Sequence, residues 1–279
     1  MLKIEAIYDK GTAEELEDGL IINPPFFGVV DGTSDVPHFI GKGLSFGKMS
    51  GGEMARKIIL ETFYSAKSND SLERVVLLAN KKLAKLWQSR KIPLNPSDLI
   101  GGAAFVFAKI DSKKVNVIQG GDCFALWVMK SGKIGITKNK AYFHETEVIP
   151  IIAELMEKHK GDRKKMWLDF YKCEGQLRLR YYNKKVGFAM LNGQTALKKC
   201  WQKIEIPISN LELLFLFSDG FVPIERETKL AKKVLNFYKK GGLHYILRKK
   251  REFEKATEKE SYRVYDEATA IALKFDNLE

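Results

Sequence analysis

The sequence predicts an α+β fold, an α-β-β-α sandwich of two antiparallel sheets flanked by helix pairs. Short apolar or alternating runs, typical of strands, occur in blocks near both ends and in the middle of the chain. Between these blocks, apolar residues recur at helical spacing in pairs of segments. Two sheets packed face to face, with the helix pairs outside, would bury the apolar face of every element.

The N-terminal block predicts three strands, over Leu2 to Tyr8, Leu20 to Ile22 and Phe26 to Val30. The third run is rich in aromatic and β-branched residues, which favour strands. Asn23-Pro24-Pro25 reads as a turn, because proline cannot donate to a sheet ladder. We expect Asp31-Gly32 to form a second turn that ends the third strand, since glycine takes backbone angles that other residues resist.

Two amphipathic helices are predicted next. Residues Thr33 to Met49 are rich in Gly, Ser and Pro and predict a loop. Ser50 is placed to cap the first helix, and Glu53 lies at the spacing of a capping box. Ser71 to Arg90 predicts the second helix, whose apolar stripe we assign to core packing.

The middle of the chain predicts four strands joined by short turns as one antiparallel meander. They are Ala103 to Ile110, Lys114 to Gln119, Cys123 to Met129 and Lys133 to Ile136. Two further strands are expected at Val186 to Leu191 and Trp201 to Ile208, and another at Ala270 to Phe275.

Charge rises between Lys138 and Lys185, where helices are expected near Glu145 to Lys160 and Arg163 to Tyr171. We interpret residues 138–185 as a helical insertion at the sheet edge, beside the acidic residues discussed below, within a single domain over residues 1–279. Two basic helices are predicted at Glu227 to Lys240 and Leu243 to Lys259.

Bulk properties favour a globular protein. The chain has 279 residues, an apolar fraction of 45% and a mean hydropathy of -0.23, which fit one domain with a real core. No apolar run is long enough for a membrane span, and the first residues lack the apolar segment of a signal peptide. The three cysteines form no metal spacing and no even disulfide set, so we expect a reducing, cytoplasmic setting. We also expect a monomer.

The formal charge of +12 and the isoelectric point near 9.4 leave three interpretations open. The basic residues, concentrated in 158–185 and 229–259, can be solvated helix faces. They can attract a phosphorylated protein substrate, or they can bind nucleic acid. The sequence carries no fingerprint of a nucleic-acid-binding motif, so nucleic acid is the least favoured partner, and no membrane partner is expected.

Carboxylates recur at predicted strand ends. An isolated Asp-Gly after a strand is most simply a hairpin turn with a solvated side chain, but here the arrangement is repeated, and no cluster of Cys and His competes with it. Oxygen ligands of this kind suit Mg²⁺ or Mn²⁺ rather than Zn²⁺. The residues concerned are Glu17, Asp18, Asp31, Asp122, Asp219 and Asp266.

These motifs, taken in order, resemble the metal-dependent protein phosphatases of type 2C, the PPM family. Each motif is short, and the resemblance depends on their order and spacing over about Lys3 to Phe275. The matching stretches are Glu17-Asp18, Phe26-Phe27-Gly28-Val29-Val30-Asp31-Gly32, Gly121-Asp122, Phe217-Ser218-Asp219-Gly220 and Asp266-Glu267-Ala268-Thr269.

The resemblance implies a serine/threonine phosphatase that hydrolyses phosphate monoesters of a phosphorylated protein. Water bridging two Mg²⁺ or Mn²⁺ ions would attack the phosphorus. Asp31 would bridge both ions, the Gly32 carbonyl and Glu17 would serve one, and Asp219 and Asp266 the other. Asp122 resembles the carboxylate that helps to hold a third ion in bacterial members. Asp31 and Asp219 are therefore the predicted catalytic residues.

The sequence departs from the family pattern in three places. Ala13 stands where the family commonly has an arginine that grips the phosphate. Thr33 stands where many eukaryotic members have a histidine proposed as the general acid, and His38 lies in the following loop. Glu267 replaces the asparagine that usually follows the ligand at Asp266. These departures motivate an alternative, a catalytically weak or inactive relative that binds phosphoproteins as a regulator.

Overall fold

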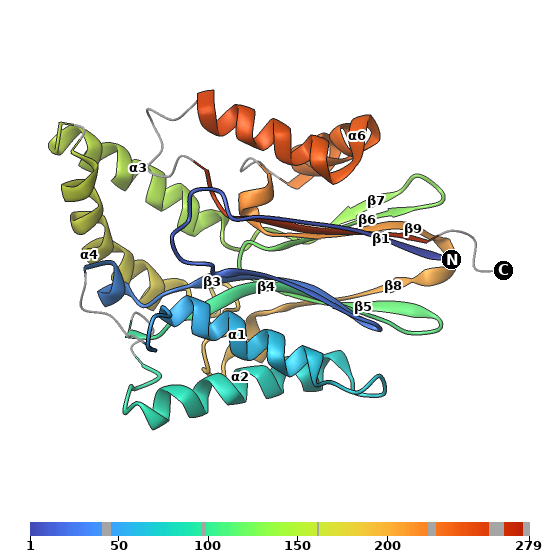
Figure 1. Cartoon of the computed structure of the whole chain (residues 1–279), viewed down its shortest axis with the longest axis horizontal. Coiled ribbons are helices and arrows are strands. Elements are labelled where there is room, and N and C mark those ends of the chain that lie inside the picture. The colour runs from blue at the N-terminus through green and yellow to red at the C-terminus, as the bar shows by residue number, and fades with distance from the viewer. Residues whose placement is uncertain (41–45, 96–98, 161, 223–226, 257–264, 276–279) are drawn as a thin grey trace.

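Two five-stranded antiparallel sheets pack against each other between helices in the computed structural model, as the sequence predicts (Figure 1). The structure describes residues 1–40, 46–95, 99–160, 162–222, 227–256 and 265–275. Within these ranges, no helix is both long and apolar enough to cross a membrane. Both chain termini lie at one end of the sandwich, and α3 and α4 lie at the other.

One sheet contains both the first and the last strand of the described residues. Its strand order is β1-β10-β9-β6-β7. The bounds are β1 Leu2–Asp9, β10 Ala268–Phe275, β9 Leu211–Phe217, β6 Phe124–Met129 and β7 Ile134–Ile136. The pairing of β1 with β10 brings the C-terminal strand, and the acidic residue before it, back beside the N-terminal segment.

The second sheet has the order β2-β3-β4-β5-β8. The bounds are β2 Asp18–Asn23, β3 Phe26–Thr33, β4 Gly102–Ile110, β5 Lys114–Gly120 and β8 Gln202–Pro207. Strand β3, next to the central strand β4, is largely buried, because one of its faces packs on the opposite sheet and the other on helices. Phe27 and Val29 belong to the core between the sheets, whereas Phe26 and Val30 pack towards the helices.

Helices α1 (Gly51–Tyr64) and α2 (Leu72–Ser89) cover the outer face of the second sheet. The predicted capping box is confirmed: Ser50 accepts a hydrogen bond from the Glu53 amide, and Glu53 accepts one from the Ser50 amide. The predicted stripe of α2 is also confirmed as core, since its apolar residues pack with α1 and the sheet around the buried Trp87.

Helix α6 (Glu227–Ala256) covers the outer face of the first sheet, with a break at Gly241 and Gly242. Both predicted basic helices are therefore present on either side of the break; residues 257–259 of the second lie outside the described residues. Glu5 of β1 stabilises the break, because its carboxylate accepts hydrogen bonds from the Leu243 amide (2.8 Å) and the Tyr238 hydroxyl (3.0 Å).

Helices α3 (Tyr142–Lys158) and α4 (Arg163–Tyr181) lie across the end of the sandwich. Both were expected, but α4 continues ten residues beyond the predicted end at Tyr171. Its last turns pack beside the 3₁₀ helix η1 (Val36–Ile40), inside the stretch predicted as loop, and α4 therefore reaches the end of β3.

Three local predictions are wrong. Asp31 and Gly32 do not form a turn but continue β3, because Asp31 pairs with Asp18 on one side and Ala104 on the other. The four middle strands are not one meander: β4 and β5 pair in one sheet, and β6 and β7 in the other. Residues 186–191 contain no strand: Val186 is exposed, and residues 187–191 form an irregular buried segment bridged to Ala103. The short helix α5 (Leu197–Cys200) follows it.

Candidate metal centre

The candidate carboxylates gather at the end of the sandwich that carries α3 and α4. Asp31 lies near the end of β3, and Asp18 opens β2 directly opposite it. Asp219 begins the 3₁₀ helix η4 (Asp219–Phe221) after β9, Asp122 lies between β5 and β6, and Asp266 precedes β10. Two sheets thus deliver acidic residues that are up to 248 positions apart in sequence to one place.

The Asp31 carboxyl group lies at the centre of this acidic cluster. Removal from water raises its pKa well above the ordinary value, and the charges of Asp18, Asp219 and Asp122 raise it further. Asp31 also shares a hydrogen bond with the Asp219 carboxyl group. The pKa of Asp219 is raised too, first by burial and then by the charge of Asp266. These mutual effects require the carboxyl groups to lie close together.

Exposure separates Asp18 from the other carboxylates. Asp31, Asp122, Asp219 and Asp266 are half-buried and reach solvent, whereas Asp18 is only 3% exposed. Burial, followed by the charge of Glu267, raises the pKa of Asp18 to about 8. The Ser218 hydroxyl donates a hydrogen bond to its Oδ2 (2.9 Å). Asp18 therefore lies behind the cluster, joining β2 to the end of β9.

Glu17 lies beside the cluster and is held by two serines. Its Oε1 accepts hydrogen bonds from Ser34 Oγ (2.6 Å) and Ser50 Oγ (2.8 Å), and its carbonyl accepts one from the Gly32 amide (3.0 Å). A Cβ at Gly52 would stand 2.1 Å from Glu17 Oε1, so only glycine leaves room for this carboxylate at the start of α1.

Glu267, one of the three departures from the family pattern, connects the two sheets at this end by hydrogen bonds. Its Oε2 accepts hydrogen bonds from the backbone amides of Glu17 (2.8 Å) and Asp18 (3.2 Å). The Tyr8 hydroxyl donates to its Oε1 (2.8 Å). A glutamate here thus fixes the backbone that carries two acidic residues.

Arg178 of α4 is a contributor that the sequence did not reveal. Its side chain is 1% exposed and forms an ion pair with Glu174 (2.7 Å). The guanidinium also donates hydrogen bonds to the Ser34 carbonyl and to Thr33 Oγ1 (2.9 Å). The residues that follow Asp31-Gly32 are therefore fixed by a buried cation of α4, which supports the prediction that the 138–185 segment lies beside the acidic cluster.

No family model matches the sequence, and no curated protein matches it either. Solved structures do match in three dimensions. Staphylococcus aureus Stp1, a serine/threonine phosphatase, superposes with a TM-score of 0.57 at 15% identity over 99% of this chain and 96% of that one. The catalytic domain of the serine/threonine phosphatase PstP, solved with two manganese ions, gives 0.56 at 14% identity over 98% and 97%. PppA of Pseudomonas aeruginosa gives 0.56 at 12% over 98% and 97%.

The chain has the fold of these bacterial phosphatases. The match extends over nearly the whole length of both chains, so the type 2C resemblance noted from the motifs is confirmed for the fold. Identities of 12 to 15% do not carry activity across, and the chemistry must be argued from the residues of this chain.

The donor set of this phosphatase fold suits a hard divalent cation. The cluster offers carboxylate oxygens at the solvent edge, and repulsion among them would be relieved by bound Mg²⁺ or Mn²⁺. Among the described residues, no three His, Cys, Asp or Glu side chains already stand as a complete ligand set. Asp31 is instead hydrogen-bonded to Asp219, and Glu17 to two serines. Binding of a metal would exchange these contacts for metal contacts.

The positions of the other departures are also clear. Ala13 lies in a short turn, its amide bonded to the Lys10 carbonyl (3.1 Å). The Thr33 hydroxyl accepts a hydrogen bond from Arg178. His38 Nε2 lies 2.7 Å from Glu15 Oε1. None of these contacts by itself supplies a phosphate grip or a general acid.

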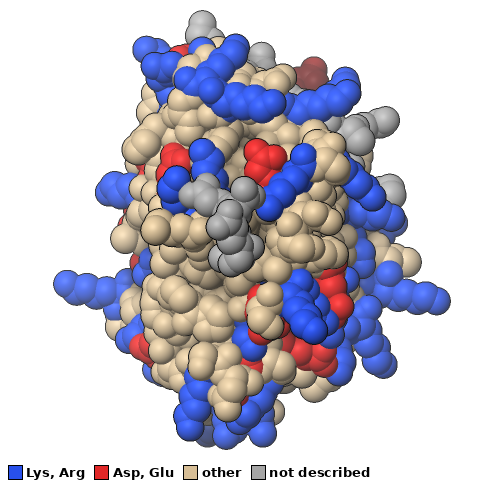
Figure 2. Space-filling model, turned by 90° about the vertical axis from the view of Figure 1, so that its right-hand side faces the viewer, with Lys and Arg blue, Asp and Glu red and all other residues tan. Residues whose placement is uncertain are grey.

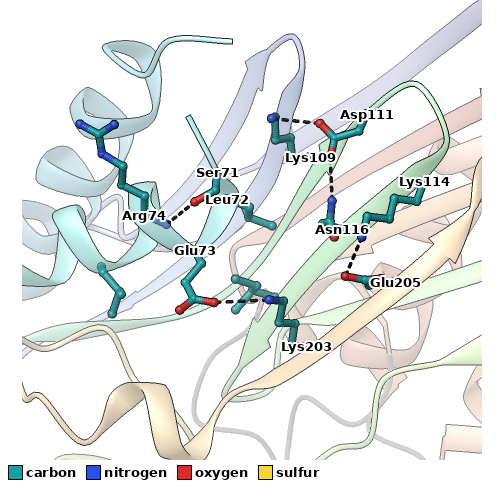
Figure 3. A pocket seen from close by; sticks show the side chains of 12 residues that line it. Ser71, Leu72, Glu73, Arg74, Lys109, Asp111, Lys114, Asn116, Lys203 and Glu205 are labelled. Atoms are coloured by element: carbon teal, nitrogen blue, oxygen red, sulfur yellow. Dashed lines mark hydrogen bonds and ion pairs between the residues drawn. The ribbon is translucent and has the colours of Figure 1, made fainter. Parts of the chain in front are cut away.

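A groove of about 590 Å³ lies at the end of the sandwich opposite to the acidic cluster, between the start of α2 and strands β5 and β8 (Figure 3). Its charges are paired, with Lys109 against Asp111 and Lys114 against Glu205, both at 2.9 Å. Figure 2 views this end of the molecule, where Lys and Arg side chains lie around the outline and also within the face, beside Asp and Glu side chains.

Proposed function

We propose that this protein is a metal-dependent serine/threonine protein phosphatase that hydrolyses phosphate monoesters of phosphorylated proteins. The observation that carries the proposal is the convergence of Asp31, Asp219 and Asp122: Asp31 shares a hydrogen bond with Asp219, and the charges of Asp219 and Asp122 both raise the pKa of Asp31. Carboxylate groups that lie close together repel one another, and a fold without a metal site has no evident need for such an arrangement. The phosphatase fold of the chain gives the cluster its interpretation.

Within this proposal, Asp31, Asp219, Asp266, Glu17 and the Gly32 carbonyl would hold two Mg²⁺ or Mn²⁺ ions, and Asp122 a third. When bound, the ions would supply an activated water for in-line attack and neutralise charge on the phosphate. Four of these carboxylates, Asp31, Asp122, Asp219 and Asp266, are half-buried rather than fully enclosed, which would leave them within reach of a phosphoprotein.

Residues of the second layer maintain this arrangement. Glu267 fixes the backbone of Glu17, Ser34 and Ser50 hold its carboxylate, and Asp18 with Ser218 holds β2 against β9. Such supporting contacts matter because ligands that are already oriented lose less conformational freedom when a metal binds.

The decisive experiment compares three proteins in hydrolysis of p-nitrophenyl phosphate and a phosphothreonine peptide with Mn²⁺. Asp219→Asn should lower the rate on the order of a hundredfold. Asp111→Asn, which removes the same charge from a half-buried residue paired with Lys109 at the opposite end of the molecule, should match the wild type. Equal rates for Asp219→Asn and the wild type would remove the mechanism.

The alternative, a phosphoprotein-binding regulator without strong catalysis, is favoured by two positions. Ala13 offers no guanidinium, and the Thr33 hydroxyl is engaged by Arg178. Calorimetry separates the two functions. Mn²⁺ binding together with turnover supports the enzyme, whereas phosphopeptide binding with neither metal binding nor turnover supports the regulator.

A further inference from the structure

One turn of α6 surrounds Asp266 on three sides. The Asp266 amide donates to Glu254 Oε1 (3.2 Å), and its carbonyl accepts from Arg251 Nη2 (2.7 Å). Its side-chain Oδ2 lies 3.7 Å from Lys250 Nζ. A single helical turn therefore fixes the backbone of this candidate ligand and places a cation against its carboxylate.

Lys250 is buried, which is unusual for a lysine. Its side chain is 8% exposed, and its ammonium also lies 3.3 Å from Glu254 Oε1. The positive charge acts beyond Asp266, because it partly offsets the rise in the pKa of Asp219. The ammonium is thus a fixed charge of the acidic cluster, unlike the neighbouring Lys249, which is one-third exposed and paired with Glu252.

We propose that Lys250 is a positioning residue and a permanent counter-cation of the acidic cluster, holding the Asp266 carboxylate and weakening the affinity of the Asp219 and Asp266 side for a divalent ion. This inference rests on the proposed function, since it concerns the metal that the cluster would hold. Nothing in the type 2C motifs specifies a lysine at this position of the chain.

The direction of the effect follows from charge. A dication beside Asp266 would be repelled by an ammonium a few ångströms away, because Lys250 is buried and its charge is less screened than a charge at the open surface. Removal of that ammonium should tighten binding by about tenfold or more. The Asp266 backbone would keep its bonds to Arg251 and Glu254. A variant that lacks only the ammonium therefore tests the charge and leaves the remaining support in place.

The test is calorimetric titration of the whole protein with MnCl₂ alone. Lys250→Met should bind Mn²⁺ about tenfold more tightly than the wild type, and Lys250→Arg should restore wild-type affinity. Lys249→Met makes the same change in net charge on the same helix and should leave affinity unchanged. A residue with a merely structural role would not tighten metal binding when it is removed.

Melting in EDTA provides an independent readout without metal. Lys250→Met should melt at a lower temperature than Lys249→Met, because Glu254 and Asp266 would lose their buried partner. If Lys250→Met does not fold, Lys250→Gln, which can still donate a hydrogen bond, replaces it in both measurements.

The possible outcomes are distinct. Binding of Mn²⁺ by the wild type with equal or weaker affinity in Lys250→Met would overturn the inference and leave the metal centre standing. Absence of Mn²⁺ binding by every variant would overturn both the metal centre and the role of Lys250 towards a metal. Tighter Mn²⁺ binding by Lys250→Met, with unchanged affinity in Lys249→Met, supports both the metal centre and the role of Lys250.

Discussion

Replacement of Arg178 by methionine should destabilise the protein strongly. The guanidinium is buried, is paired with Glu174 at 2.7 Å and donates to the Ser34 carbonyl and the Thr33 hydroxyl. Methionine has a similar length but no charge, so it would leave the Glu174 carboxylate in the interior without its cation. Breaking a buried ion pair in this way costs about 3 to 5 kcal/mol.

The expected shift in melting temperature follows from the size of the chain. An unfolding entropy of about 2.1 cal/mol/K per residue gives roughly 0.6 kcal/mol/K for a chain of this length. A loss of about 4 kcal/mol then lowers the melting temperature by about 7 °C. Differential scanning calorimetry in EDTA measures this shift without any contribution from a metal.

Arg180→Met is the matched control. Arg180 lies two residues away on the same helix, but its side chain is 63% exposed and its partner Glu147 is also at the surface. An exposed pair contributes about 0 to 1 kcal/mol, so this variant should melt within about 2 °C of the wild type. The double variant Glu174→Gln with Arg178→Met should recover part of the loss, because no unpaired charge remains. Similar melting of the two single arginine variants would refute the assignment of Arg178 as a buried anchor.

Two other substitutions test different parts of the structure. In EDTA, Asp31→Asn should raise the melting temperature, because it removes a carboxylate that repels Asp219 and its neighbours; a lower melting temperature would contradict the electrostatic account of the cluster. Asp169→Asn should speed amide exchange in α3 and α4, because Asp169 joins these helices through Lys158 (3.0 Å). Its cationic neighbours hold the pKa of Asp169 below its usual value, so the stabilisation from this link is full above the ordinary carboxyl pKa of about 4. Below that pH it declines gradually and is lost only as the pH falls through the lowered pKa. Amide exchange that is the same in both proteins at neutral pH would refute the link.

Local sequence signals predicted those features that depend on neighbours in the chain. Ser50 and Glu53, three residues apart, form the capping box that their spacing predicts. Helix α2 buries the apolar stripe that the helical spacing of its residues predicts. Asp31-Gly32 was interpreted wrongly for a related reason. The dipeptide favours a turn by itself, but ladder partners on both sides hold it in β3.

The supporting cations of the site were missed because they are defined by distant partners. Arg178 lies in a charged segment that reads as a solvated helix face, yet it is buried against Ser34, which is 144 positions away. Lys250 lies among basic residues of α6, and only the fold brings Asp266 to it. Likewise, residues 186–191 are apolar enough for a strand, but burial alone does not provide a ladder partner.

The basic composition of the chain therefore has two physical origins. Many lysines and arginines are at the surface, where they can interact with partners or solvent (Figure 2). Arg178 and Lys250 are instead buried: Arg178 pairs with Glu174 and also interacts with the charge of Glu17, whereas Lys250 pairs with Glu254 and Asp266. Buried like charges oppose folding unless cations lie nearby, so a cluster assembled from both sheets requires fixed positive charges from the helices beside it. By this reasoning part of the excess basic charge belongs to the site itself, and the net charge of +12 overstates what is available for recruiting an anionic partner.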